Sequence, residues 1–350
     1  MMKFAVVGAG VIGRLRAQTV VDHPNTELVG IADVDRVAVT KVSQQYRVPA
    51  YADYRQLIDE CKPDAVIISS PVTLHREMCE YAFSRGCHVL VEKPMSNSIE
   101  GCQAILRAAA AAKRTLAVGF NHRFYTAVKY LRQVLDEGKI GTLDHVRIFG
   151  GHDGLHNFRA DWMFKGDLSG GGAMMDVGIH LTDLGRYLAG EVTEVYGFAS
   201  GKIWNVPGSE DNAVAVMRTS NGIPITYQTT WTEWRGYGWY VDVYGTGGMV
   251  RASYAPMFNL LITQDKPGGK RTKLVKRYPE IMVREKVKGW QTTSKLSFDD
   301  ELIEFLRMVQ GATDARMADG WSGLRANEIA QAVYRSTKDG DRVVLSTRDV

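Results

Sequence analysis

The first part of the chain alternates short apolar runs with segments of helical periodicity. The apolar runs contain no alternating polar positions, and they lie at 3–7, 28–33, 65–69, 89–91 and 116–118. Helices are predicted between them, after residue 10 and at 36–46, 54–60, 75–85 and 99–112. Such strands are typical of a parallel sheet covered by helices on both faces. With right-handed crossovers, the pattern predicts an α/β Rossmann domain, a doubly wound parallel sheet, over residues 1–120.

Beyond residue 120 the pattern changes to successive strands. Two helices are predicted at 125–137 and 173–188, with an alternating strand at 143–150 between them. Further strand-like runs lie at 195–202, 213–219, 223–232, 239–244, 248–252, 260–263 and 272–275. They predict an α+β domain with an open, mainly antiparallel sheet over residues 121–350. Two last helices, at 298–309 and 321–336, are able to pack back on the first domain.

Composition and charge narrow the class of protein. The 350 residues suffice for two cores, and 45% hydrophobic with 23% charged residues is typical of a soluble globular protein. A net charge of +4 implies no general affinity for polyanions. The basic run at 270–277 resembles a charged edge strand, and it lacks the interleaved aromatics of a nucleic-acid site. No apolar run is long enough to span a membrane, so we expect a cytoplasmic protein.

The cysteines give no sign of a disulfide framework or a metal site. All four lie in the first third of the chain, at Cys61, Cys79, Cys87 and Cys102, without C-x-x-C spacing. We therefore expect buried, reduced thiols and no bound metal.

A glycine-rich turn follows the first predicted strand and opens the first helix. It contains Gly8, Gly10, Val11, Ile12 and Gly13 in the spacing G-x-G-x-x-G. Glycines allow a tight turn and a close approach of the backbone to a pyrophosphate, while the helix N-terminus favours an anion. The turn therefore predicts a dinucleotide-binding site.

Asp33 ends the second strand, at the interval after the turn that is usual for a ribose-binding carboxylate. Its charge would repel a 2′-phosphate, so NAD is expected and NADP is disfavoured. Arg36 is the counter-argument, because it could accommodate that phosphate, and Asp33 could alternatively cap a helix. Ser70 and Pro71 end the third strand, where a crevice ligand would lie; His75 then either contacts the cofactor or caps the next helix.

Lys93 lies in the run Glu92-Lys93-Pro94, directly after the fourth strand. The proline biases Lys93 toward an extended conformation, so its side chain is directed rather than free. An amine directed at a nicotinamide ring is a candidate acid/base, and the positive ring would lower its pKa. The alternative is a solvated lysine at the end of a strand.

A second candidate group follows three consecutive glycines. On an α-helix, Asp176, His180 and Asp183 share one face because they are four and three residues apart. Histidine titrates near neutral pH and is a natural proton carrier. The alternative is an aspartate at a helix N-terminus with an exposed histidine. No second metal ligand with matching spacing is evident on this helix.

The chain resembles the Gfo/Idh/MocA family of glucose–fructose oxidoreductase, inositol dehydrogenase and rhizopine-catabolism proteins. The resemblance rests on the glycine turn, the E-K-P motif, the segment 119–124, the D-x-G-x-H motif and residues 323–325. It implies NAD(P)-dependent dehydrogenation, with Lys93 and His180 as acid/base and Asp176 holding substrate and orienting His180. It also implies that Glu92, Lys93 and Asn121 contact the cofactor, and that Arg123 contacts the substrate.

The variable loop 151–167 carries the candidate substrate contacts. Its polar groups and one flat ring, together suited to a polyol, belong to His152, Asn157, Arg159 and Trp162. We expect a sugar, sugar derivative or cyclitol, although Arg159 could equally form a salt bridge with Asp161 or Asp167. The aromatic residues at 231, 234, 239 and 240 offer further rings, but strand aromatics more often form a core or a subunit interface.

Two other functions stay open at this point. Transient oxidation beside a glycosidic carbon would permit elimination, giving a redox-neutral, NAD-dependent glycosidase. A non-enzymatic NAD-dependent sensor is disfavoured by the intact catalytic motifs. A homodimer or homotetramer is expected, because the open sheet has no helical layer in sequence to cover its second face.

Overall fold

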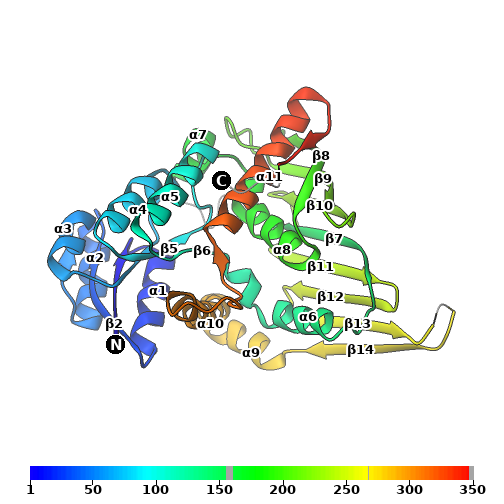
Figure 1. Ribbon diagram of the computed structural model, residues 1–350, viewed down its shortest axis with the longest axis horizontal. Coiled ribbons are helices and arrows are strands. Elements are labelled where there is room, and N and C mark those ends of the chain that lie inside the picture. Colours follow the sequence, from blue (N-terminus) through cyan, green and yellow to red (C-terminus); the bar gives the residue numbers. More distant parts are fainter. Residues whose placement is uncertain (155–160, 267, 347–350) are drawn as a thin grey trace. The chain divides into compact units, whose positions relative to one another are not determined.

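The chain divides into two compact units. The structure, a computed structural model, describes residues 1–154, 161–266 and 268–346. The first unit comprises Met1–Phe124 and Trp290–Leu324, and the second comprises Tyr125–Gly289 and Arg325–Val350 (Figure 1). The first unit therefore contains, beyond the segment 1–120 expected from the sequence, a stretch from the C-terminal part of the chain.

The first unit is built on a seven-stranded sheet with the order β15-β6-β5-β4-β1-β2-β3. All neighbours are parallel except β15, which pairs antiparallel with β6. The strands are β1 Met2–Val7, β2 Thr26–Ala32, β3 Ala50–Tyr51, β4 Ala65–Ile68, β5 His88–Glu92, β6 Leu116–Gly119 and β15 Ala318–Asp319. The predicted doubly wound parallel sheet is confirmed, while the two-residue strands β3 and β15 were not predicted.

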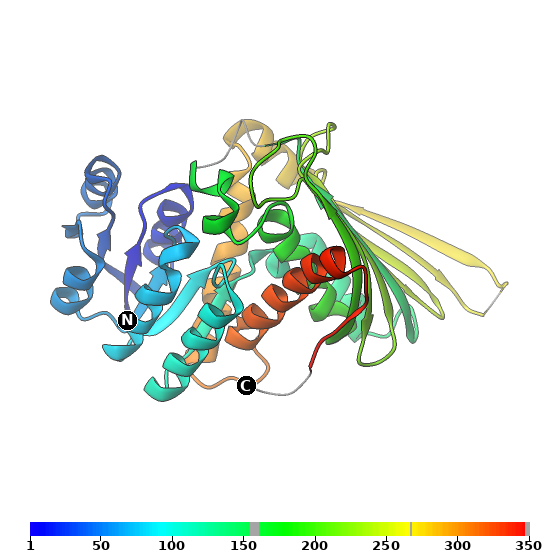
Figure 2. The ribbon, with the colours of Figure 1, turned by 90° about the horizontal axis from the view of Figure 1, so that it is seen from above.

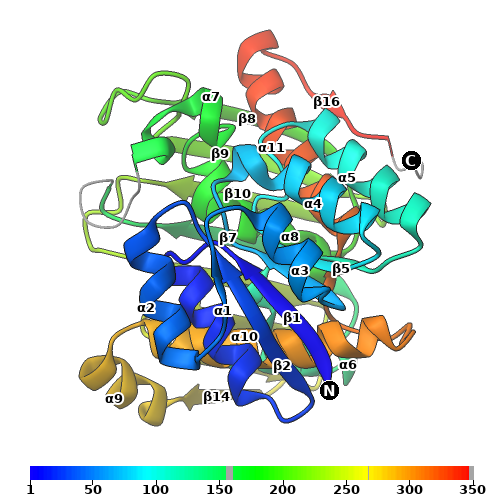
Figure 3. The same cartoon turned by 90° about the vertical axis from the view of Figure 1, so that its left-hand side faces the viewer.

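Helices cover both faces of this sheet, which is why its strands are apolar throughout. The helices are α1 Val11–Asp22, α2 Arg36–Tyr46, α3 Tyr54–Cys61, α4 His75–Ser84, α5 Ile99–Ala112 and α10 Gln291–Val309, with the short turns η1 Val72–Leu74 and η2 Asn121–Phe124. Phe4, Ile31 and Ile67 share one core with Val20 of α1 and Phe305 of α10. Helices α3 and α4 lie on the opposite face (Figure 3).

The second unit is built on a nine-stranded sheet with the order β14-β13-β12-β11-β7-β10-β9-β8-β16. Only the pair β7–β10 is parallel. The strands are β7 Leu143–Gly151, β8 Val192–Ser200, β9 Asn212–Thr219, β10 Pro224–Thr230, β11 Gly238–Gly245, β12 Gly248–Tyr254, β13 Phe258–Gln264, β14 Arg271–Arg277 and β16 Val343–Val344. The mainly antiparallel sheet is confirmed, and so is the charged edge strand, because β14 lies at the edge and is exposed throughout.

Helices of the second unit pack on one face of its sheet (Figure 2). The helices in contact with the sheet are α6 Thr126–Asp136 and α8 Ile179–Ala189. The unit also contains α7 Gly166–Ser169, α9 Pro279–Lys288 and the short turns η3 Asp161–Phe164 and η4 Met174–Gly178. Helix α11, Gly320–Asp339, begins in the first unit and ends in the second. Along β9, Ala215 and Met217 are buried, whereas Val214 and Val216 on the other face are exposed. The sheet is therefore half-covered, in contrast to the sheet of the first unit.

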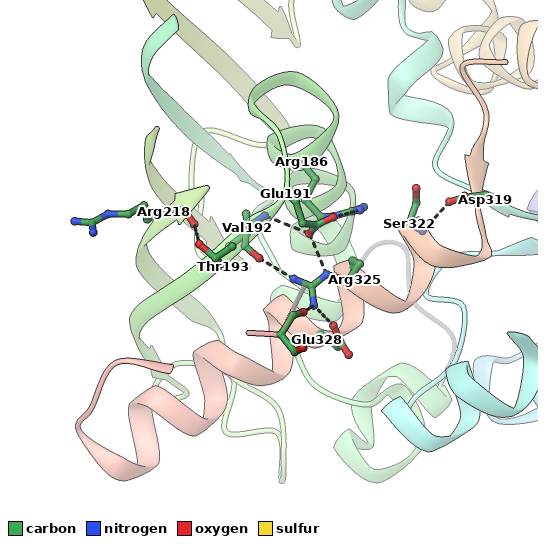
Figure 4. Close-up of polar contacts among 10 residues, drawn as sticks. Arg186, Glu191, Val192, Thr193, Arg218, Asp319, Ser322, Arg325 and Glu328 are labelled. Atoms are coloured by element: carbon green, nitrogen blue, oxygen red, sulfur yellow. Dashed lines mark hydrogen bonds and ion pairs between the residues drawn. The ribbon is translucent and has the colours of Figure 1, made fainter. Parts of the chain in front are cut away.

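Arg325 organises the end of α8 and the start of β8. Its side chain is 1% exposed, and it donates to the Glu191 carboxylate at 2.9 Å and to the Val192 carbonyl at 2.7 Å (Figure 4). It also donates to the Ser346 carbonyl at 2.8 Å and pairs with Glu328. A buried guanidinium needs such acceptors around it, so Arg325 fastens the last described residues to the second unit.

The described residues include no membrane-spanning helix and no disulfide bond. No helix in this part of the chain combines the length and apolarity that crossing a bilayer requires. The four cysteines are free; Cys61 is half-buried and the other three are buried.

Candidate functional site

The glycine turn of the first unit has the form required to hold a diphosphate. Gly8 has a φ of +103°, and a Cβ at this position would lie 2.4 Å from the Ser69 carbonyl oxygen. A Cβ at Gly13 would lie 1.9 Å from the carbonyl oxygen of Gly8, whereas at Gly10 it would meet nothing within 4 Å. No side chain caps the N-terminus of α1, which begins at Val11. The turn therefore leaves open space at a helix N-terminus, where an anion is stabilised.

Asp33 connects the glycine turn to the end of β2. Its Oδ2 accepts a hydrogen bond from the Ala9 backbone N–H at 2.5 Å, and its Oδ1 accepts one from the Asp35 N–H at 2.8 Å. The cap of α2 is Asp35, which accepts from the N–H groups of Val37 and Ala38. The alternative of Asp33 as a helix cap is therefore wrong. Its half-buried carboxylate keeps acceptor capacity for ribose hydroxyls, and Arg36 nearby is exposed.

His75 joins two loops at the carboxyl ends of β4 and β5. Its ring is 1% exposed, with Nδ1 3.0 Å from the Pro94 carbonyl oxygen and Nε2 3.0 Å from the Ser70 carbonyl oxygen. Burial lowers its pKa. The ring does not cap α4, whose N-terminus has no side-chain cap. His75 therefore links the segment that contains Ser70 and Pro71 to the segment that contains Lys93.

Lys93 follows a buried ion-pair network at the end of β5. Glu92 pairs with Arg16 at 2.6 Å, and Arg16, which is 1% exposed, also pairs with the fully buried Glu301 of α10. A Cβ at Gly119 would lie 2.8 Å from the Arg16 guanidinium, so glycine makes room for this pair. Glu92, expected to contact the cofactor, is thus bound to Arg16, and this ion pair fixes the backbone directly before Lys93. Lys93 itself is half-buried.

The turn η2 brings a histidine into the environment of Lys93. Burial and, secondly, the positive charge of Lys93 lower the pKa of His122 to about 3, so His122 is neutral at physiological pH. Asn121 donates to the Ser297 hydroxyl at 2.8 Å, and Arg123 donates to the Arg316 carbonyl at 3.3 Å. These two residues, expected to contact cofactor and substrate, are buried and connect η2 to the C-terminal part of the unit. The sequence pattern did not indicate this role for His122, although the residue lies inside the motif at 119–124.

In the second unit, Asp176 is held by two N–H donors. It is 5% exposed, and its Oδ2 lies 3.0 Å from His152 Nε2 and accepts from Trp231 Nε1 at 3.0 Å. The backbone N–H of Gly154 donates to His152 Nδ1 at 3.2 Å. His152 Nδ1 is therefore the unprotonated nitrogen, and Nε2–H donates to Asp176. Both ring nitrogens of His152, expected to bind substrate, are thus engaged within the chain.

The helix that carries Asp176 and His180 differs from the one expected. Residues Met174–Gly178 form a π-helical turn, in which the Gly178 N–H donates to the Ala173 carbonyl at 2.8 Å, and α8 starts at Ile179. The prediction of one α-helix from 173 to 188 is therefore wrong at its first turn. The π-type hydrogen bond spans five residues instead of four, so the backbone that carries Asp176 differs from the α-helix that the spacing predicts. His180 is 7% exposed.

The remaining candidates of the loop are only partly described. Trp162 lies in η3 and is half-buried. Asn157 and Arg159 lie outside the described residues. Trp231, considered as a core or interface ring, is 1% exposed and directs its N–H at Asp176.

The structure thus brings the predicted residues together in two groups. The first unit holds the glycine turn, Asp33, His75 and Lys93, and the second holds His152, Asp176 and His180. Among the described residues, no cluster of three or more histidine, cysteine, aspartate or glutamate side chains could hold a metal ion.

Two family models match the chain in succession. Residues 2–120 match GFO_IDH_MocA, described as an oxidoreductase family with an NAD-binding Rossmann fold. Residues 128–251 match the GFO/IDH/MocA C-terminal domain. The matched segments fall on the two successive domain types predicted from the sequence.

Curated relatives and solved structures align along nearly the whole chain. The uncharacterized oxidoreductase YrbE of Bacillus subtilis is 28% identical, over 96% of this chain and 94% of the relative. The inositol 2-dehydrogenase of Rhizobium meliloti is 25% identical, over 99% of both chains. The WlbA dehydrogenase of Bordetella pertussis, solved with NADH and UDP-GlcNAcA, has a TM-score of 0.82 at 22% identity, over 99% of this chain and 98% of that structure. The similarity to the WlbA structure, at 22% identity, shows a shared fold.

Proposed function

Because the chain belongs to the Gfo/Idh/MocA family of NAD-dependent oxidoreductases, we propose that it is a dehydrogenase of a ring hydroxyl. Its substrate is a sugar, a sugar derivative or a cyclitol, oxidised at a secondary alcohol or reduced from the ketone. The observation that carries this proposal is the buried Asp176 carboxylate, held by two N–H donors and four residues before His180. A fixed carboxylate close in sequence to a histidine is an arrangement suited to proton transfer.

The residues of the first unit fit NAD. The open glycine turn at the N-terminus of α1 would hold the diphosphate, and Asp33 would accept hydrogen bonds from the adenosine ribose. The same carboxylate disfavours NADP, since a 2′-phosphate would face a negative charge. Bound NAD would supply the acceptor for the hydride of the alcohol carbon, and these residues would hold it in place.

Proton transfer is assigned to Lys93 and His180. Lys93 is directed by its neighbours: Glu92 is fixed by Arg16, and the Pro94 carbonyl is fixed by His75. A neutral His122 avoids placing a second positive charge against Lys93. In the second unit, Asp176 would orient His180 or a substrate hydroxyl through its remaining acceptor capacity. His152 would support Asp176 rather than bind the substrate, because its ring is already engaged.

The class of substrate is supported by the relatives and by the loop chemistry. One relative is named for inositol, and one structural neighbour was solved with a sugar nucleotide. Trp162 offers a flat ring for the apolar face of a sugar.

A substrate screen tests the proposed reaction. NADH formation is measured with a panel of cyclitols, aldoses, glycosides and uronates, with NAD and NADP in parallel. We expect NADH formation with at least one polyol and a preference for NAD. A substrate deuterated at the oxidised carbon must then yield deuterated NADH. If glycosides are cleaved without net NADH, the redox-neutral glycosidase reaction replaces the proposal.

A second copy of the chain is the proposed occupant of the open sheet face. Tyr196 pairs with Val216 and Phe198 with Val214 across β8 and β9, and all four are exposed, by 39% to 58%. Such a contiguous apolar patch on a face without helices is typical of a subunit interface. Sedimentation velocity should give a dimer or tetramer, and Phe198→Glu should shift it toward the monomer. A monomeric wild-type protein would contradict this proposal.

A further inference from the structure

A buried carboxylate outside the predicted site holds the start of the π-turn η4. Glu210, two residues before β9, is 7% exposed. Its Oε1 accepts from the Met174 backbone N–H at 2.6 Å, and its Oε2 accepts from the Gly172 N–H at 2.8 Å. Each oxygen thus satisfies one amide that the first helical turn leaves without an intrahelical partner. An ionised carboxylate is suited to this because it only accepts hydrogen bonds.

The carbonyl groups of the same turn are held from β10. The Tyr227 hydroxyl donates to the Gly178 carbonyl at 2.9 Å, and the Thr229 hydroxyl donates to the Ala173 carbonyl at 3.3 Å. A Cβ at Gly178 would lie 2.5 Å from the Tyr227 hydroxyl oxygen, so glycine is required for this approach. The π-turn is therefore fixed at both ends by side chains from other elements.

The glycines before the turn allow this arrangement. A Cβ at Gly172 would lie 2.0 Å from the Glu210 carbonyl oxygen, and one at Gly171 would lie 2.1 Å from the Tyr334 hydroxyl oxygen. Burial and the negative charge of Glu210 raise the pKa of Tyr334 well above its ordinary value. Burial likewise raises the pKa of Glu210, against the opposing effect of the amides of Met174 and Gly172. The run of glycines thus admits a buried carboxylate next to the backbone.

We infer that Glu210 is a positioning residue for the proposed reaction. By binding the amides of Gly172 and Met174, it keeps η4 in the π-helical form that sets the directions of Asp176 and His180. π-turns are rare and occur frequently at functional sites, and this one is stabilised by side chains rather than by its own sequence. The inference rests on the proposed function in so far as Asp176 and His180 act in catalysis.

Glu210→Gln is the variant that tests it. The substitution keeps the size of the side chain but turns one acceptor oxygen into an NH2 group, which would face a backbone N–H. Glu191→Gln is the matched control. Glu191 pairs with Arg186 at 2.6 Å and with Arg325 at 2.9 Å, and its loss affects the other end of α8 (Figure 4). Both variants should lose stability, so stability alone does not distinguish them.

The first readout is the imidazole spectrum of the cofactor-free protein. With labelled histidine, the Nε2–H proton of His152 should be protected and shifted downfield by its carboxylate partner, and it is assigned by its loss in His152→Gln. We expect this signal to move or vanish in Glu210→Gln and to stay in Glu191→Gln. An unchanged signal in Glu210→Gln would overturn the inference. If Glu210→Gln does not fold, Tyr227→Phe tests the other end of the turn, with the same signal expected to move.

The second readout separates this inference from the proposed function. With NAD and myo-inositol, or the best polyol of the panel, Glu210→Gln should lose about 10- to 100-fold in kcat. Its KM for NAD should stay unchanged, and so should the kcat of Glu191→Gln. A wild-type kcat in Glu210→Gln would contradict the inference. If the wild type oxidises no polyol while the His152 signal responds as expected, the proposed function fails and the positioning of Asp176 stands.

Discussion

The two units hold their candidate proton-transfer residues in different ways. In the first, the strand before Lys93 ends in Glu92, which is fixed by the buried charges of Arg16 and Glu301. In the second, Asp176 is fixed by uncharged N–H donors, from His152 and Trp231. A buried charge can be compensated either by an opposite charge, as at Glu301, or by N–H donors, as at Asp176.

This difference predicts whether a substitution in each unit lowers folding stability or turnover. Removing Arg16 would leave two carboxylates facing each other in the core of the first unit. Removing the Trp231 donor from Asp176 would leave the His152 donor in place. We therefore expect changes in the first unit to act mainly on folding stability, and changes around Asp176 to act on turnover.

Arg16→Met should have the largest effect on stability. The half-buried carboxylate of Glu92 and the fully buried one of Glu301 lose their partner, which should lower the free energy of unfolding by about 3–5 kcal/mol. Urea unfolding measures this, and Arg76→Met is the control. Arg76 pairs with Glu80 on the surface of α4, so its loss should cost about 0–1 kcal/mol. Equal losses in the two variants would show that the buried network is not what supports the strand before Lys93.

Trp231→Phe should have a smaller effect, seen in turnover. It removes the Trp231 donor to Asp176 and keeps an aromatic ring, which should cost about 1.5–3 kcal/mol in a hydrogen bond to a charged group. A fall in kcat with an unchanged KM for NAD is expected. Trp234→Phe is the control, because Trp234 is 67% exposed. If Trp231→Phe destabilises the protein and leaves kcat unchanged, the proposed difference between the two units is wrong.

His122 predicts a modest dependence of stability on pH. Its pKa is about 3 in the folded state, because of burial and then Lys93, against about 6.5 in an unfolded chain. Below pH 6.5 the unfolded state therefore binds a proton that the folded state does not. The free energy of unfolding consequently decreases as the pH is lowered. Between about pH 6.5 and 5, wild type should lose about 1.5 kcal/mol more than His122→Gln. Parallel stability curves for the two proteins would show that His122 is not held neutral beside Lys93.

Local patterns predicted the first unit well. The glycine turn, Asp33 and the apolar strands depend on neighbours in the sequence, and the structure places them as one parallel sheet with an open turn at α1. The edge strand β14 was predicted for the same reason, since four of its seven residues are basic and such a strand is suited to the solvent-exposed edge of a sheet. Helix α9, which follows it, was not predicted, because only Ile281 of that helix is buried and no apolar face marks it.

Long-range contacts explain what the sequence did not predict. The π-turn at Met174–Gly178 depends on Glu210, which lies 36 residues after Met174, and on Tyr227 from β10. Spacing of four residues between Asp176 and His180 predicts an α-helix, and no local signal contradicts it. The contact of His152 with Asp176 was not predicted for a similar reason, because Asp176 lies 24 residues further on. In the sequence, Glu210 is only one of two acidic residues that precede a strand, and nothing local links it to Met174.

The most direct test of the account measures turnover and NAD binding in Lys93→Ala and Asp176→Asn. Two surface variants serve as controls: Lys41→Ala, on the exposed side of α2, and Asp144→Asn, which removes a surface Asp–His pair with His145. We expect Lys93→Ala and Asp176→Asn to bind NAD with the affinity of the wild type. They should lose about 10²- to 10⁴-fold in NADH formation from the best polyol, while the controls keep their activity. Near-normal turnover in Lys93→Ala or Asp176→Asn would contradict the assignment of these residues to proton transfer.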